Sequence, residues 1–105
     1  MTSLSTHVLD TAEGGPASGV AVTLELSVDG VWQHVGKGVT DTDGRVTDLG
    51  AALGSGIYRL VFATGDYGSP FFPEVHLVVD LDGSEEHYHV PILLSPFGYT
   101  TYRGS

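Results

Sequence analysis

The chain has 105 residues, of which 41% are hydrophobic and 16% charged, a length and composition typical of a single globular domain. Thirteen acidic and four basic residues give a net charge of −9, which argues against binding to nucleic acid or to an anionic membrane. The sequence contains no cysteine, so disulfides, thiolate catalysis and thiolate metal sites are excluded.

Alternating apolar and polar residues predict about seven short strands and no long helix. In chain order, the expected strands span residues 4–10, 20–28, 31–39, 56–63, 74–81, 87–94 and 99–105. Glycine, proline and aspartate mark the turns between them, as in the hairpin signal Asp29-Gly30. We expect residues 48–55 to form a loop or a single helical turn. This pattern predicts an all-β sandwich.

The last nineteen residues, 87–105, form a predicted hairpin around the turn Ser-Pro-Phe-Gly. Side chains alternate between the two faces of a strand. One face of the first arm carries His87, His89, Pro91 and Leu93. The other face is apolar and is therefore expected to pack in the core; it carries Tyr88, Val90, Ile92 and Leu94.

Three positions carry candidate chemistry, namely His7, Arg45, and His89 together with Tyr102. Histidine suits general base catalysis because its pKa lies near working pH. An arginine beside it would hold a carbonyl-rich or anionic substrate through a planar fork of donors. The chain has no Gly-x-Ser-x-Gly motif, so water is the expected nucleophile. Arg103 follows Tyr102, and the two side chains should leave opposite faces of the terminal strand.

The other histidines have simpler interpretations. His34 and His76 are expected to be partly exposed strand residues, and His87 to be solvated or to pair with the two glutamates before it. The His-x-His pair of His87 and His89 could instead bind zinc together with His7. His-x-His is frequent by chance, so a metal site is the weaker alternative.

Long, ordered motifs at both ends of the chain resemble those of the 5-hydroxyisourate hydrolases, a branch of the transthyretin-related proteins. The resembling segments are Leu4–Thr11, Gly15–Ala17, Thr42–Arg45, Gly56–Tyr58, His87–Tyr99 and Tyr102–Ser105. The resemblance implies one transthyretin-like domain over residues 1–105, a sandwich of two four-stranded sheets. It also implies a homotetramer, a dimer of dimers with the site at a subunit interface.

One departure from the family lies at residues 65–70, where these proteins usually have a short helix between the fifth and sixth strands. This segment, Gly-Asp-Tyr-Gly-Ser-Pro, is too short and too rich in glycine and proline for such a helix. We expect a loop or a single turn there. The segment lies away from the matched site motifs, so the chemistry should be unaffected.

The resemblance implies hydrolysis of 5-hydroxyisourate to 2-oxo-4-hydroxy-4-carboxy-5-ureidoimidazoline in urate degradation, without a metal or another cofactor. By the matching positions, the catalytic residues would be His7, Arg45 and His89. The substrate-binding residues would be Tyr102, Arg103, Gly104 and Ser105. The alternative is a transthyretin-like protein that binds a small ligand without catalysis.

The sequence also bears on localisation. No apolar run approaches the roughly 18 residues that a membrane-spanning segment needs. The N-terminal Met-Thr-Ser-Leu-Ser-Thr-His lacks the basic and apolar regions of a secretory signal. We therefore expect a cytoplasmic protein whose partners are its substrate and other copies of itself.

Overall fold

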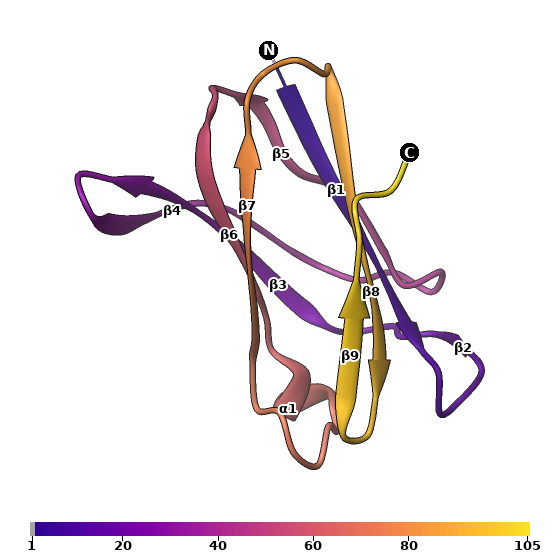
Figure 1. The fold of residues 1–105 in the computed structure, drawn as a ribbon. Helices are drawn as coiled ribbons and strands as arrows, with labels where there is room; N and C mark the ends of the chain where they lie inside the picture. Colours follow the sequence, from indigo (N-terminus) through magenta and orange to yellow (C-terminus); the bar gives the residue numbers. More distant parts are fainter. Residues whose placement is uncertain (1) are drawn as a thin grey trace.

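A computed structural model describes residues 2–105 and has two β-sheets packed face to face with one short helix (Figure 1). The expected all-β sandwich is confirmed. In chain order, the elements are β1 (Thr2–Asp10), β2 (Gly15–Pro16), β3 (Ala21–Val28), β4 (Val31–Val39), β5 (Arg45–Leu53), β6 (Gly56–Phe62), α1 (Thr64–Tyr67), β7 (Val75–Leu81), β8 (His87–Ser95) and β9 (Gly98–Thr101).

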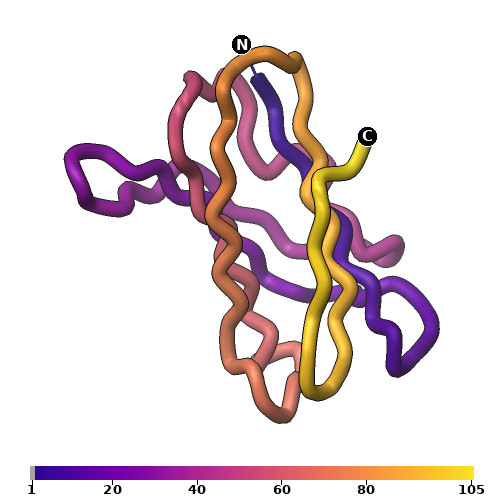
Figure 2. Tube along the Cα trace, in the orientation of Figure 1, coloured from indigo at the N-terminus to yellow at the C-terminus, as the bar shows by residue number. Residues whose placement is uncertain are grey.

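The first sheet has the strand order β2-β1-β8-β9, with β5 also paired to β1, and the second has the order β4-β3-β6-β7. The first sheet thus has five strands rather than the expected four, because the two-residue strand β2 pairs with the end of β1. β1 and β8 run parallel, whereas the other paired strands within residues 2–105 run antiparallel. Figure 2 shows the N-terminal strand, in indigo, alongside the orange β8.

The core between the sheets is built from alternate residues of the strands. The predicted apolar face of β8 is buried, with exposed fractions of 5% for Tyr88, 6% for Val90, 0% for Ile92 and 3% for Leu94. On β1, Thr6 is also fully buried, and its hydroxyl donates to the Val90 carbonyl at 2.6 Å. Because side chains alternate, the next residues along β1 and β8 face outward from the sandwich. That outer face carries the polar cluster described below.

The prediction of a loop or helical turn over residues 48–55 is wrong, because β5 continues to Leu53. The strand is irregular, with register shifts against β1 and a φ of 55° at Ala52. Its buried Leu49 and Leu53 pack in the hydrophobic core. Tertiary packing therefore makes this segment a strand although its Gly- and Ala-rich sequence has little β propensity.

The segment between β6 and β7 contains α1, a helix of four residues, which confirms the single turn expected there. The Tyr67 hydroxyl of this helix donates to Asp10 Oδ2 at 2.6 Å. This hydrogen bond lowers the pKa of Asp10 and, together with burial, raises the pKa of Tyr67 to about 12. The short helix is thereby tied to the end of β1. No helix in residues 2–105 has the length and apolar character needed to cross a membrane.

Two glycines allow β4 to pass close to β5. A Cβ atom on Gly36 would overlap the Leu49 carbonyl oxygen, and one on Gly38 would lie 2.6 Å from Val46 Cγ1. Real Cβ atoms do not approach other atoms so closely, so a side chain at either position would push the two strands apart.

We expect Gly36→Ala to lower the free energy of unfolding by about 1–3 kcal/mol, because a methyl group inserted into a packed region forces the backbone to shift. Gly54→Ala is the matched control, since a Cβ there would have no neighbour within 4 Å; it should change stability by less than about 0.5 kcal/mol. Urea unfolding followed by circular dichroism would measure both. Equal, small effects would contradict the proposed close packing.

Candidate active site

A cluster of polar side chains lies on the outer face of β1 and β8. Because the two strands are parallel, Ser5 lies beside His89 and His7 beside Pro91. The rings of His7 and His89 have centroids 6.5 Å apart and planes inclined by 37°. Two of the predicted site residues, far apart in the sequence, are therefore neighbours in the fold.

Arg45 reaches this cluster from the start of β5, and its Cα pairs with that of His7 on β1. The Asp41 carboxylate accepts hydrogen bonds from the backbone N–H groups of Asp43 at 2.9 Å and Arg45 at 3.0 Å. The hydrogen bond from the Arg45 backbone N–H is the main reason that the pKa of Asp41 is lowered. The Asp43 carbonyl in turn lies 2.8 Å from His7 Nε2. A carbonyl can only accept, so His7 carries a proton on Nε2.

The C-terminal tail crosses directly over His89. The Gly104 N–H donates to the His89 carbonyl at 2.8 Å, and a Cβ on Gly104 would lie 2.7 Å from Cδ2 of the His89 ring. Only glycine permits this approach without moving the imidazole. The register of the β8–β9 pair continues to Gly104, which places Tyr102 on the same face as His89. Ser105 is exposed at the end of the tail.

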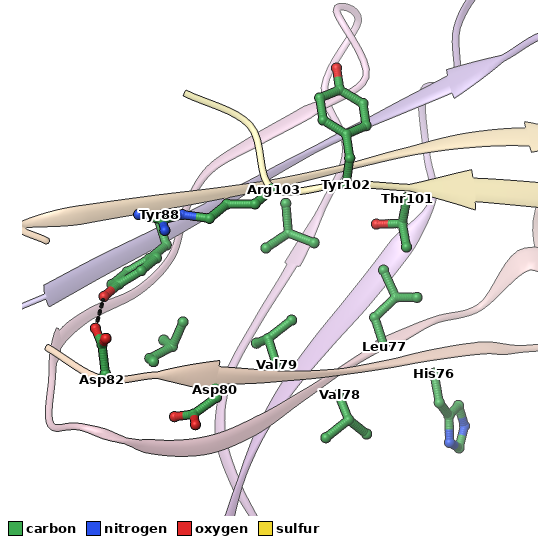
Figure 3. A pocket seen from close by; sticks show the side chains of 12 residues that line it. His76, Leu77, Val78, Val79, Asp80, Asp82, Tyr88, Thr101, Tyr102 and Arg103 are labelled. Carbon is green, nitrogen blue, oxygen red and sulfur yellow. Dashed lines mark hydrogen bonds between the residues drawn. The ribbon is translucent and has the colours of Figure 1, made fainter. Parts of the chain in front are cut away.

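Arg103 points to the opposite face, as its alternation with Tyr102 predicts. It borders a cavity of about 430 Å³ between β7 and the C-terminal hairpin (Figure 3). Its guanidinium lies 5.0 Å from the Tyr88 ring centroid and 3.4 Å from Glu85 Oε1. Figure 3 shows the Tyr102 ring projecting away from this cavity. Arg103 is thus separated from the two site histidines, neither of which lines the cavity.

Burial lowers the pKa of His89, and the positive charge of Arg45 lowers it further, with smaller effects from the neighbouring histidines. The ring is therefore neutral at neutral pH and able to accept a proton. His89 Nδ1 lies 2.8 Å from Ser5 Oγ, whereas its Nε2 has no hydrogen-bond partner among residues 2–105. This arrangement leaves Nε2 free to act on a bound molecule.

His87 is exposed at the start of β8, as the first of its two interpretations expects, but within residues 2–105 its ring contacts serines rather than the preceding glutamates. Its Nδ1 lies 2.6 Å from Ser3 Oγ and its Nε2 lies 2.8 Å from Ser5 Oγ. Within residues 2–105, no ion pair joins it to a glutamate. Neither serine is a predicted site residue. The strand alternation that places Ser5 on the face of His7 was the available signal, but the pairing of β1 with β8 is not visible in the sequence.

The other histidines lie apart from this cluster. His34 is exposed on β4, and His76 is exposed on β7, 3.2 Å from Glu74, which agrees with their expected positions on strands. In the part of the chain that the structure describes, no group of three or more His, Cys, Asp or Glu side chains is placed to hold a metal ion.

The sequence and the fold are both similar to those of proteins in one family. A model of the HIUase/transthyretin family matches residues 4–104. The chain is 46% identical over 109 residues to 5-hydroxyisourate hydrolase of Salmonella typhimurium, covering 97% of this chain and 80% of the relative. It also resembles the solved structure of Klebsiella pneumoniae 5-hydroxyisourate hydrolase, with a TM-score of 0.86, 37% identity and coverage of 100% of each chain.

Sea bream transthyretin in complex with thyroxine is similar too, with a TM-score of 0.90, 34% identity and coverage of 96% of this chain and 93% of that one. The backbone therefore does not by itself separate a hydrolase from a transthyretin. The two functions have to be distinguished by the side chains on the outer face of β1 and β8.

We expect the imidazole of His89 to titrate below 6.5, the ordinary pKa of histidine. Arg45→Gln should raise the pKa of His89 toward that value without reaching it, because burial, the larger cause, remains. Lys37→Gln, which removes a charge from β4 in the other sheet, is the control and should leave the pKa of His89 unchanged. NMR titration of the histidine ring protons would measure all three proteins, and a His89 pKa at or above 6.5 in the parent would contradict this account.

Proposed function

Because this chain belongs to the HIUase/transthyretin family, we propose that it is an enzyme that hydrolyses 5-hydroxyisourate to 2-oxo-4-hydroxy-4-carboxy-5-ureidoimidazoline in urate degradation. The observation that carries the proposal is the meeting of His7, Arg45 and His89 on one open face of the sandwich. A flat substrate with several carbonyl groups fits a site of two imidazoles and one guanidinium.

The reaction opens the six-membered ring of the substrate at an amide and leaves a carboxylate. In the proposed mechanism, His89 Nε2 takes a proton from water while the water oxygen bonds to the amide carbonyl carbon. The C–N bond then breaks, and its nitrogen receives a proton. His89 is assigned as the base because its Nε2 is unpartnered in residues 2–105 and its pKa is lowered by burial. His7 is less suited, since its Nε2 donates to the Asp43 carbonyl.

The remaining site residues bind and orient the substrate. The Arg45 guanidinium grips the ring carbonyls and stabilises negative charge that develops on the carbonyl oxygen. His7 orients the attacking water from the neighbouring position. At the C-terminal tail, the substrate-binding residues are Tyr102, Gly104 and Ser105. Arg103 does not contact the substrate in this scheme. Its contacts with Tyr88 and Glu85 hold the C-terminal tail over the site.

We propose that four copies assemble as a dimer of dimers and that the site is completed at a subunit interface. Two features support this. β7 and β9 are the last strands of their sheets, and apolar side chains on them remain exposed, with 60% of Val78 and 40% of Tyr99 accessible. The three site residues lie on an open sheet face, where a second subunit would supply the missing walls. Light scattering in solution should give the mass of four 11.0 kDa chains, and a monomer would contradict the proposal.

Residues 1–105 are proposed to act as one hydrolase domain. The cytoplasmic location expected from the sequence remains a prediction, which fractionation of cells that produce the protein would test.

The rival function is binding of a small aromatic ligand without catalysis, which the similarity to transthyretin in complex with thyroxine favours. A carrier of apolar aromatic ligands does not need a neutral imidazole beside a guanidinium. The two functions therefore differ in their dependence on His89. A ligand that binds equally well to the parent and to His89→Asn, with no turnover by either, would favour the rival.

We expect His89→Asn to lower kcat by about 10²–10⁴-fold, the usual contribution of a general base. His34→Asn is the matched control, because His34 is an exposed strand histidine outside the cluster, and it should retain the parent rate. Both rates can be read from the ultraviolet decay of 5-hydroxyisourate. Full activity in His89→Asn would show that His89 is not the base.

A further inference from the structure

Four side chains beside the proposed base form a continuous hydrogen-bonded row. His89 Nδ1 lies 2.8 Å from Ser5 Oγ, and the same oxygen lies 2.8 Å from His87 Nε2. His87 Nδ1 lies 2.6 Å from Ser3 Oγ, which is 3.4 Å from the Glu86 carbonyl. The row runs from the half-buried His89, through the buried Ser5, to the exposed His87.

The Ser5 hydroxyl has only one proton but two imidazole neighbours, so it donates to one ring and accepts from the other. In one order, His89 Nδ1–H donates to Ser5 and the Ser5 hydroxyl donates to His87 Nε2. The N–H group at His87 Nδ1 then donates to Ser3 Oγ, and the Ser3 hydroxyl donates to the Glu86 carbonyl. This order satisfies every donor in the row and leaves the lone pair of His89 on Nε2, where a base needs it.

We propose that Ser5 and His87 form a proton relay that carries charge away from His89 during the reaction. The inference rests on the proposed function, because it requires His89 to be the base. Ser5 and His87 do not contact the substrate in this scheme. They act through His89, and we therefore describe them as positioning residues.

Each step of the relay balances. When His89 Nε2 takes a proton from water, its Nδ1 proton passes to Ser5 Oγ, and the Ser5 hydroxyl proton passes to His87 Nε2. His89 is then neutral with a proton on Nε2, and the positive charge lies on His87. When the C–N bond breaks, His89 Nε2 gives its proton to the leaving nitrogen, and the two relay protons move back. The product acid loses its remaining proton to solvent.

Electrostatics favours this direction of transfer. A positive charge on His89 would be buried beside the Arg45 guanidinium, and both burial and that guanidinium oppose it. His87 is exposed, and its Cα pairs with that of Ser3, four residues along β1 from His7, which is roughly 13 Å along the strand from the residue opposite Arg45.

Two variants interrupt the relay at different points. His87→Gln keeps a hydrogen-bonding side chain that cannot take up a proton, and Ser5→Ala removes the connecting hydroxyl. We expect either change to lower kcat by roughly 10–100-fold, less than the loss of the base itself, with KM within about two-fold of the parent. The double variant should lose no more than the more impaired single variant, because both act on one chain of bonds. His76→Gln, an exposed histidine outside the row, is the control and should keep the parent kcat.

Solvent isotope effects separate a relay from a merely structural role. The rate of the parent in mixtures of H₂O and D₂O should follow a curve, because several protons move together, whereas that of His87→Gln should follow a straight line. If Ser5→Ala does not fold, Ser5→Thr is the second variant. It keeps the hydroxyl and should therefore show the curved dependence of the parent.

The outcomes distinguish the relay from the function on which it rests. A parent protein that does not accelerate the decay of 5-hydroxyisourate removes the proposed function itself. A parent activity that His89→Asn abolishes but His87→Gln retains, with the same kcat and the same curved isotope dependence, overturns the relay and leaves the function standing.

Discussion

The site depends on the parallel pairing of β1 with β8 in the middle of the first sheet. This pairing joins residues from the two ends of the chain. The Ser5 hydroxyl is hydrogen-bonded to the rings of His87 and His89, which lie 82 and 84 residues away in the sequence. The same pairing buries Thr6 against Val90 on the inner face. One ladder of backbone hydrogen bonds therefore fixes both the core and the polar cluster, and a shift by one residue would exchange the two faces.

Close backbone contacts complete the arrangement. The Asp41 carboxylate holds the turn that leads into Arg45 at the start of β5, and the Asp43 carbonyl of that turn fixes His7. On the other side, Gly104 lets the tail lie against the His89 ring. Such supports matter because a catalytic group displaced by about 1 Å can lose much of its effect. The electrostatic result is a neutral imidazole beside a permanent cation, which is the state that a base requires.

Strand alternation made much of this predictable from the sequence. It assigned Tyr88 and Ile92 to the core and left His89 on the opposite face, as the structure confirms. The strand β5 was missed because its pairing is decided by partners distant in sequence rather than by its own residues. The contacts of His87 were missed for the same reason, since its neighbours on β1 follow from topology. Periodicity reports which face a residue occupies, but not which strand lies beside it.

The backbone resembles that of transthyretin, so the proposed function depends on side-chain chemistry. We propose that this face hydrolyses 5-hydroxyisourate with water activated by an imidazole. The most direct test is to generate the substrate from urate with urate oxidase and to follow its ultraviolet decay with and without the protein, in the presence of a chelator. We expect a decay rate that rises in proportion to protein concentration and is unchanged by the chelator. Decay at the spontaneous rate in the presence of the folded protein would contradict it.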